Sequence, residues 1–186
     1  MKRTIAIIIA GSILAAWAVA APNHVGTRRQ NQQSRIAQGV RSGSLTAGET
    51  ANLERKESAI NQEVRTDRSL NGGRLTGQER QIINGQQNRM SNQIYRDKNN
   101  TATQYYGSNQ VDARRYNQQQ RVAGGIASGR LTAGETSRLE GGEAAINRET
   151  WTDRAANGGR LTPGERSVIN GQQSVLSGKI YQDKHN

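Results

Sequence analysis

The chain has 186 residues, of which 32% are hydrophobic and 22% are charged, and its formal net charge at pH 7 is +11. It has no Cys and only two His, which excludes disulfides, thiol nucleophiles and His-based metal sites. The length predicts one or two domains. The positive charge predicts attraction to anionic partners, with solubility alone as the alternative explanation.

Residues 1–20 have the pattern of a secretory signal peptide. Lys2 and Arg3 precede an apolar run that ends in the small residues Ala18-Val19-Ala20 of a cleavage site. We therefore expect cleavage after Ala20 and export to the periplasm or the extracellular space. An uncleaved anchor is the alternative, but the run is short for a membrane span. After cleavage no transmembrane segment is expected, since no second apolar run is long enough.

The rest of the chain is an internal duplication with a constant offset of 86 residues. The repeated segments include Arg28-Arg29 with Arg114-Arg115, Asn71-Gly72-Gly73 with Asn157-Gly158-Gly159, and Ile94-Tyr95 with Ile180-Tyr181. Self-similarity at a fixed period is typical of repeat architectures. Two homologous modules are predicted, residues 28–100 and 114–186, joined by a polar linker over residues 101–113.

Each module contains the motif Gly-x-Leu-Thr-x-x-Glu twice. The Thr side chain can accept a hydrogen bond from the backbone N–H three residues later, while the Glu accepts one from the Thr N–H, an arrangement called a capping box. Each copy therefore predicts the start of a helix. The predicted capping pairs are Thr46 with Glu49, Thr76 with Glu79, Thr132 with Glu135, and Thr162 with Glu165.

Each module is predicted to have three helices, at about 28–41, 46–68 and 76–98 in the first module. Apolar residues recur at spacings of seven and four, which places them on one helical face. They are Leu53, Ile60 and Val64 in the second helix and Ile83, Met90 and Ile94 in the third. The predicted fold class is all-α, with two tandem homologous three-helix modules. Because this core is thin, a lone module is expected to be marginally stable. Packing of the modules on each other, homo-oligomerisation or ligand binding would each add stability.

The turn between the second and third helices resembles the calcium loop of EF-hand proteins, which supplies oxygen ligands at alternate positions around a central Gly. The matching residues are Asp67, Ser69, Asn71 and Glu79 in the first module and Asp153, Asn157 and Glu165 in the second. The resemblance implies weak calcium binding, although Glu79 and Glu165 stand one residue later than in an EF-hand. The alternative is a turn in which the same residues serve capping alone. No other cofactor is expected.

Two further resemblances concern exported bacterial proteins. The GxLTxxE segments and the stretch Ile180-Tyr181-Gln182-Asp183-Lys184-His185-Asn186 are similar to segments of exported bacterial proteins of unassigned function, which implies no activity. The stretch Leu75-Thr76-Gly77-Gln78-Glu79 resembles, more weakly, the LTxxQ signature of periplasmic stress chaperones. That resemblance implies binding of unfolded clients on a basic helical surface.

The first predicted helix of each module is the most basic. The candidate anion-binding residues are Arg28, Arg29, Arg35, Arg114, Arg115 and Arg121. We expect a non-enzymatic binding or structural protein whose basic surface contacts an anionic envelope polymer, lipid or extracellular nucleic acid. A calcium-responsive protein and a periplasmic chaperone are the alternatives. Catalysis is not expected, because the repeated Glu residues are assigned to capping, and others such as Glu54 and Glu57 are interpreted as solvated helix charges.

Overall fold

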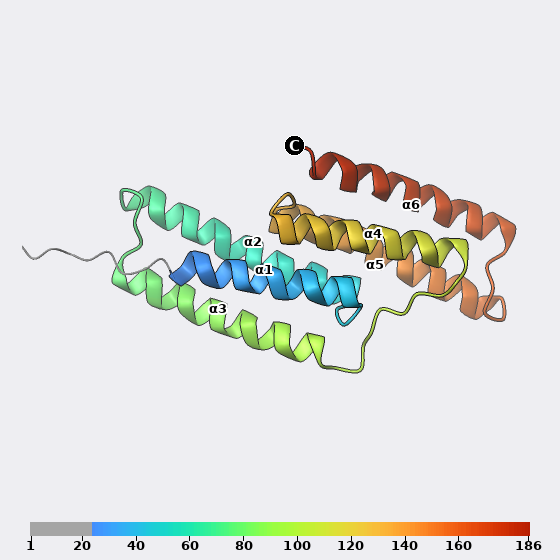
Figure 1. The fold of residues 1–186 in the computed structure, drawn as a ribbon, viewed down its shortest axis with the longest axis horizontal. Coiled ribbons are helices and arrows are strands. Elements are labelled where there is room, and N and C mark those ends of the chain that lie inside the picture. The colour runs from blue at the N-terminus through green and yellow to red at the C-terminus, as the bar shows by residue number, and fades with distance from the viewer. Residues whose placement is uncertain (1–23) are drawn as a thin grey trace, which may run out of the picture.

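The computed structural model describes residues 24–186, which form six helices and their connections (Figure 1). The helices are α1 (His24–Ser42), α2 (Ala47–Leu70), α3 (Gly77–Lys98), α4 (Gln110–Ser128), α5 (Ala133–Ala156) and α6 (Pro163–Asp183). The all-α class predicted from the sequence is confirmed. The predicted signal peptide, residues 1–20, lies outside the described residues. No helix of the described part is long and apolar enough to cross a membrane.

Local sequence sets the starts of the helices. Helices α2, α3, α5 and α6 each begin with a complete capping box formed by the Thr and Glu of the repeated motif. In α2, for example, the Thr46 N–H donates to Glu49 Oε2 at 2.9 Å. Helix α4 begins four residues before the predicted Arg114, because Asn109 caps it by accepting the Asp112 N–H at 3.2 Å.

The centre of the molecule is a bundle of α1, α2, α4 and α5, with α3 and α6 on opposite flanks (Figure 1). Helix α2 packs on α5 and α1 packs on α4. The α2–α5 pair is antiparallel, since Ser137 Oγ donates to the Ala51 carbonyl at 3.0 Å while Gly134 lies against Ser58. Ala51 and Ser137 are 86 residues apart, which is also the offset between the helix starts of the two halves, so equivalent positions meet in this antiparallel pair. The halves therefore meet around an approximate two-fold axis.

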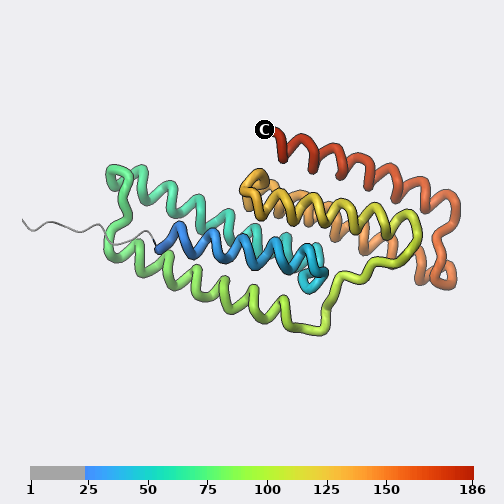
Figure 2. Tube along the Cα trace, viewed as in Figure 1, coloured from blue at the N-terminus to red at the C-terminus, as the bar shows by residue number. Residues whose placement is uncertain are grey.

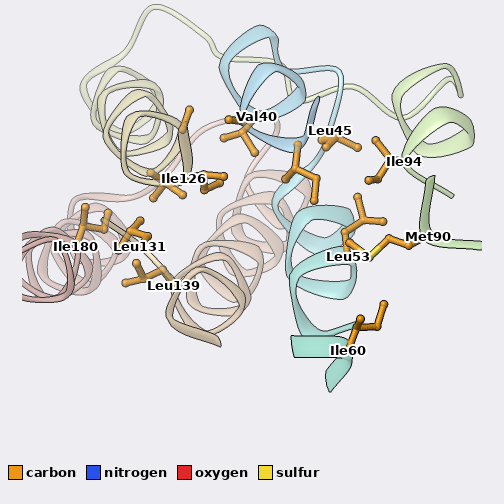
Figure 3. Packing of buried hydrophobic residues seen from close by; sticks show 14 of the residues in the cluster. Val40, Leu45, Leu53, Ile60, Met90, Ile94, Ile126, Leu131, Leu139 and Ile180 are labelled. Carbon is orange, nitrogen blue, oxygen red and sulfur yellow. The ribbon is translucent and has the colours of Figure 1, made fainter. Parts of the chain in front are cut away.

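The hydrophobic core continues through both halves (Figure 3). The predicted apolar stripes of α2 and α3 are buried, including Leu53 and Ile94. The turn after α1 adds Leu45, which packs directly on Gly39. A Cβ atom at Gly39 would lie 2.6 Å from Leu45 Cγ, so the close approach of the turn to the helix requires glycine there.

The linker between α3 and α4 packs on the protein over part of its length (Figure 2). It passes the turn between α1 and α2, where the Gln104 N–H donates to the Gly43 carbonyl at 2.8 Å. Two residues later Tyr106 meets Tyr116 of α4 edge to face, with ring centroids 5.5 Å apart. The polar linker is therefore a packed segment that carries an aromatic anchor.

Candidate functional site

Four glutamates lie in the interior on the facing helices α2 and α5. They are Glu54, Glu57, Glu140 and Glu143, and none is more than 1% exposed. Within each helix the two residues are three positions apart, so their side chains leave the same side. The prediction that Glu54 and Glu57 are solvated charges is wrong, because this side of α2 is covered by the other helices of the bundle.

These carboxyl groups have few hydrogen-bond partners. The Gln33 amide of α1 donates to Glu54 at 3.0 Å, and the Gln119 amide of α4 donates to Glu140 at 3.1 Å. The second oxygen of each of these glutamates has no hydrogen bond, and neither oxygen of Glu57 meets a donor at hydrogen-bonding geometry. Buried polar atoms without partners are costly, above all when they are charged.

Burial shifts the ionisation of the whole cluster. It raises the pKa of Glu54 to about 8 and the pKa values of Glu57 and Glu143 to about 7 each. Burial also raises the pKa of Glu140 well above its ordinary value, and the charges of Glu143 and Glu54 add to this shift. Desolvation disfavours the carboxylate form, so the cluster retains protons at a pH at which an exposed Glu has lost its own.

Arg115 is the one buried Lys or Arg in the described part of the chain. Its Nη1 lies 3.1 Å from Asp112 Oδ1, and its Nε lies 3.5 Å from Glu143 Oε1. Arg154 also pairs with Asp112, since its Nη2 lies 3.1 Å from Asp112 Oδ2. The Tyr106 ring covers the Arg115 guanidinium, with its centroid 5.6 Å from Arg115 Cζ. Arg115 is therefore an internal cation, which corrects its place among the predicted anion-binding residues.

Four of the other five predicted anion-binding residues form two arginine rows, whereas the fifth, Arg29, is exposed and belongs to neither row. Arg28 and Arg35 reach from α1 to α3, and Arg114 and Arg121 reach from α4 to α6. Each donates one hydrogen bond to the flanking helix, as Arg35 does to the Ser91 carbonyl at 3.2 Å. A guanidinium has five N–H donors, so each side chain keeps donors for an external anion.

The surface around the arginine rows has little opposing charge. Helix α1 contains no Asp or Glu, and Asp112, the acidic residue of α4, is buried. Lys98 reaches α1, with its Nζ 3.0 Å from Gln38 Oε1. Desolvation lowers the pKa of Lys98, and the charge of Arg35 lowers it further. Five of the 15 Asp and Glu residues are buried, which makes the outer surface more basic than the composition alone indicates.

The EF-hand-like residues lie at the turn between α2 and α3. Asp67 and Ser69 are still inside α2, and Asn71 is its C-cap. The Asn71 amide donates to Glu79 Oε1 at 2.8 Å, and the Thr76 N–H donates to Glu79 Oε2 at 2.7 Å. Both oxygens of Glu79 therefore already accept hydrogen bonds. The backbone bond from Thr76 is the main cause of the lowered pKa of Glu79.

The second half repeats this turn. Asn157 is the C-cap of α5 and donates to Glu165 Oε1 at 2.8 Å, while Asp153 lies inside α5. Within residues 24–186 no group of three or more His, Cys, Asp or Glu side chains is placed to hold a metal ion.

The chain matches no family model, no curated protein and no solved structure. The geometry of the helices and their side chains is therefore the basis for a functional assignment. It provides three features. They are the arginine rows, the buried carboxyl cluster, and the acidic turns, which are the turns after α2 and α5 with Asp67 and Glu79 or Asp153 and Glu165.

Proposed function

We propose that the protein is exported and non-enzymatic, and that it binds an anionic polymer of the envelope or extracellular space through the arginine rows. One observation carries this proposal: the neighbouring helices α1 and α4 present Arg28, Arg35, Arg114 and Arg121 and no exposed carboxylate. Arginine pairs well with phosphate, because its planar fork of donors matches the anion. Phosphate-bearing polymers are therefore the expected class of partner, and the signal-peptide pattern places the encounter outside the cytoplasm.

The test is salt-dependent binding of the mature chain to a fluorescent 20-base-pair DNA duplex, used as a phosphate polymer. The variant replaces the four row residues by Gln: Arg28→Gln, Arg35→Gln, Arg114→Gln and Arg121→Gln. If each Arg neutralises one phosphate, log K against log salt becomes shallower by roughly 3–4 units, and affinity at low salt falls at least tenfold.

The control variant makes the same charge change away from the rows, at exposed arginines. These substitutions are Arg74→Gln, Arg89→Gln, Arg148→Gln and Arg160→Gln. Equal weakening by both variants would mean that net charge alone attracts the duplex, and the arginine rows would then have no special role. Competition by polyphosphate and by lipopolysaccharide micelles distinguishes a general phosphate site from one that prefers an envelope component.

Calcium binding at the acidic turns is a second candidate, favoured by crowding of like charges. The pKa of Asp67 is raised first by desolvation and then by the charges of Glu79 and Glu63. The pKa of Asp153 is raised by the corresponding set in the second half. A divalent cation would relieve this repulsion.

For this candidate, calcium is expected to raise the melting temperature by about 3–6 °C when its concentration is tenfold above Kd. The informative variant is Asp67→Asn with Asp153→Asn, because it leaves all four capping boxes intact, whereas replacing Glu79 would also disturb a cap. Circular dichroism melts in EDTA and in millimolar calcium give the answer. A wild-type melt that calcium does not move removes the candidate, and so does a shift that survives in the double variant.

A further inference from the structure

An open polar pocket of about 590 Å³ lies where the first half meets the α4–α5 turn. Arg29, Gln30, Gln33 and Arg65 line it from α1 and α2, and Ser128 and Gly129 line it from the turn. Its volume is within the range of sites that hold a small ligand or a peptide side chain. The approximate two-fold axis relates this pocket to an equivalent place in the second half.

In the second half the equivalent place is filled by the chain's own linker. The Gln104 N–H donates to the carbonyl of Gly43 at 2.8 Å. Tyr106 then covers the guanidinium of Arg115, 5.6 Å from the ring centroid. Gly43 and Arg115 stand 86 residues away from Gly129 and Arg29, respectively. The linker therefore shows what the equivalent first-half pocket is built to accept: a backbone N–H on the turn carbonyl and an aromatic ring on the arginine.

Within residues 24–186 no segment covers the first-half pocket in this way. Arg115 is buried but Arg29 is exposed, and Gly43 is buried but Gly129 is exposed. A Cβ atom at Gly43 would lie 2.9 Å from the Gln104 carbonyl oxygen, whereas one at Gly129 would meet nothing within 4 Å. Among residues 24–186 no N–H donates to the Gly129 carbonyl. Within the described residues the Gly129 carbonyl therefore has no donor, whereas the equivalent Gly43 carbonyl accepts the Gln104 N–H.

The two places also differ in charge. Arg115 is paired with Asp112 at 3.1 Å, but the residue equivalent to Asp112 in the first half is Gly26. Arg29 has the partly protonated Glu57 within electrostatic range. The first-half pocket also contains a second cation, Arg65. In the second half the linker provides the Tyr106 ring and α4 provides the Asp112 carboxylate. A ligand with an aromatic ring and a carboxylate would supply both groups to Arg29.

We propose that this pocket binds an extended peptide segment that lays an aromatic side chain on Arg29, donates a backbone N–H to the Gly129 carbonyl and carries a carboxylate nearby. Backbone hydrogen bonding plus a side-chain pocket is a common mode of peptide recognition. The site is separate from the arginine rows, so it stands or falls independently of the polyanion proposal.

The probe is a labelled synthetic peptide with the sequence of residues 101–112, added in trans to the mature chain. Fluorescence anisotropy is expected to give a Kd on the order of 100 μM, and NMR shifts should centre on Gly129 and Arg29. Replacing the peptide's second tyrosine by Ala should weaken binding about tenfold, as expected for loss of a ring stacked on a guanidinium. The protein variant Arg29→Ala should have a similar effect.

Arg28→Ala is the matched protein control, since it removes the same charge one residue away, outside the pocket; it should bind the peptide normally. Absence of NMR shifts at Gly129 up to millimolar peptide would overturn the proposal. Equal affinity for the Tyr and Ala peptides would also overturn it, because attraction would then be electrostatic only. The four-Arg row variant should keep peptide binding while it loses DNA binding, which separates this site from the polyanion surface.

Discussion

The free energy of unfolding is expected to fall as the pH rises from about 5 to about 8. Burial raises the pKa of Glu54 from 4.5 to about 8, and those of Glu57 and Glu143 from 4.5 to about 7. Between these values the folded state binds more protons than the unfolded state, so stability decreases with pH through this window. Below about pH 4.5 the contribution of these groups is fully present.

The expected size of this effect is large. One pKa unit corresponds to about 1.4 kcal/mol, so the coupled cluster changes the free energy of unfolding by several kcal/mol over the window. That amount is comparable with the total stability of a typical domain. Two cations face the cluster and oppose these shifts: Arg29 lowers the pKa of Glu57, and Arg115 lowers the pKa of Glu143. Tyr106, whose own pKa is raised by burial, faces the cluster from the linker.

The variant Glu54→Gln with Glu140→Gln tests this expectation. Glutamine keeps the shape and the ability to accept the amide bonds from α1 and α4, but it does not ionise. Its melting temperature at pH 8 should exceed that of the wild type by roughly 10–20 °C, and its dependence on pH should flatten. Circular dichroism melts from pH 5 to pH 8.5 measure both quantities.

The chain offers a matched control in Glu63→Gln with Glu149→Gln. These glutamates lie nine residues beyond Glu54 and Glu140 on the same helices, are partly exposed, and each accepts an amide bond at 2.7 Å from a Gln of the flanking helix. The control should keep the pH dependence of the wild type. A wild-type melting temperature that is constant from pH 5 to pH 8.5 would contradict the assignment of buried, proton-bearing carboxyl groups.

The second large effect is expected for Arg115→Ala. This change removes the buried cation between Asp112 and Glu143 and the platform beneath Tyr106. Breaking a buried ion pair by removing one partner costs about 3–5 kcal/mol, because the remaining charge has no compensation. The loss should be smaller at pH 5 than at pH 8, since Glu143 is protonated at the lower pH and then has less need of a cation.

Arg29→Ala is the natural control, because it makes the same change at the equivalent position of the first half. Arg29 is exposed, so its loss should change stability by no more than about 1 kcal/mol. Urea unfolding of both variants at pH 5 and pH 8 gives the comparison. Equal losses in the two variants would show that burial by the linker does not distinguish the two arginines.

The starts of four helices could be predicted because they depend on residues only three positions apart. A Thr and a Glu at this spacing satisfy each other's backbone groups wherever the helix later packs. The apolar stripes were predicted for a similar reason: spacings of seven and four fix which side chains share a face. Both kinds of signal are local, and both are present in the structure.

The buried glutamates left a signal in the sequence that charge reasoning concealed. Glu57 occupies the place between Leu53 and Ile60 in the buried stripe of α2, at spacings of four and three. Glu57 follows Lys56 in the sequence, but adjacent helical residues point about 100° apart, so a charged neighbour does not make Glu57 exposed. The position of Glu57 in the stripe was therefore the better guide to its burial.

Trp151 shows that residue type alone does not decide burial. It is one of only two Trp in the chain, yet it is 72% exposed. Its place on α5 faces outward, and the aromatic anchor at the boundary of the halves is Tyr106 of the linker instead. Composition indicates how many anchors a chain has, but not which of them the packing uses.

The sequence by itself determined the helices, their caps, their buried faces and the 86-residue duplication, because these depend on neighbouring residues and on helical period. Only the tertiary structure decided that Arg115 is buried while Arg29, at the equivalent position of the first half, is exposed. The linker precedes α4 and covers Arg115, whereas Arg29 stays exposed beside an open pocket. Local sequence shows one difference between the two arginines, Asp112 before Arg115 against Gly26 before Arg29. It does not show the desolvation of Arg115, which the linker causes only when it packs.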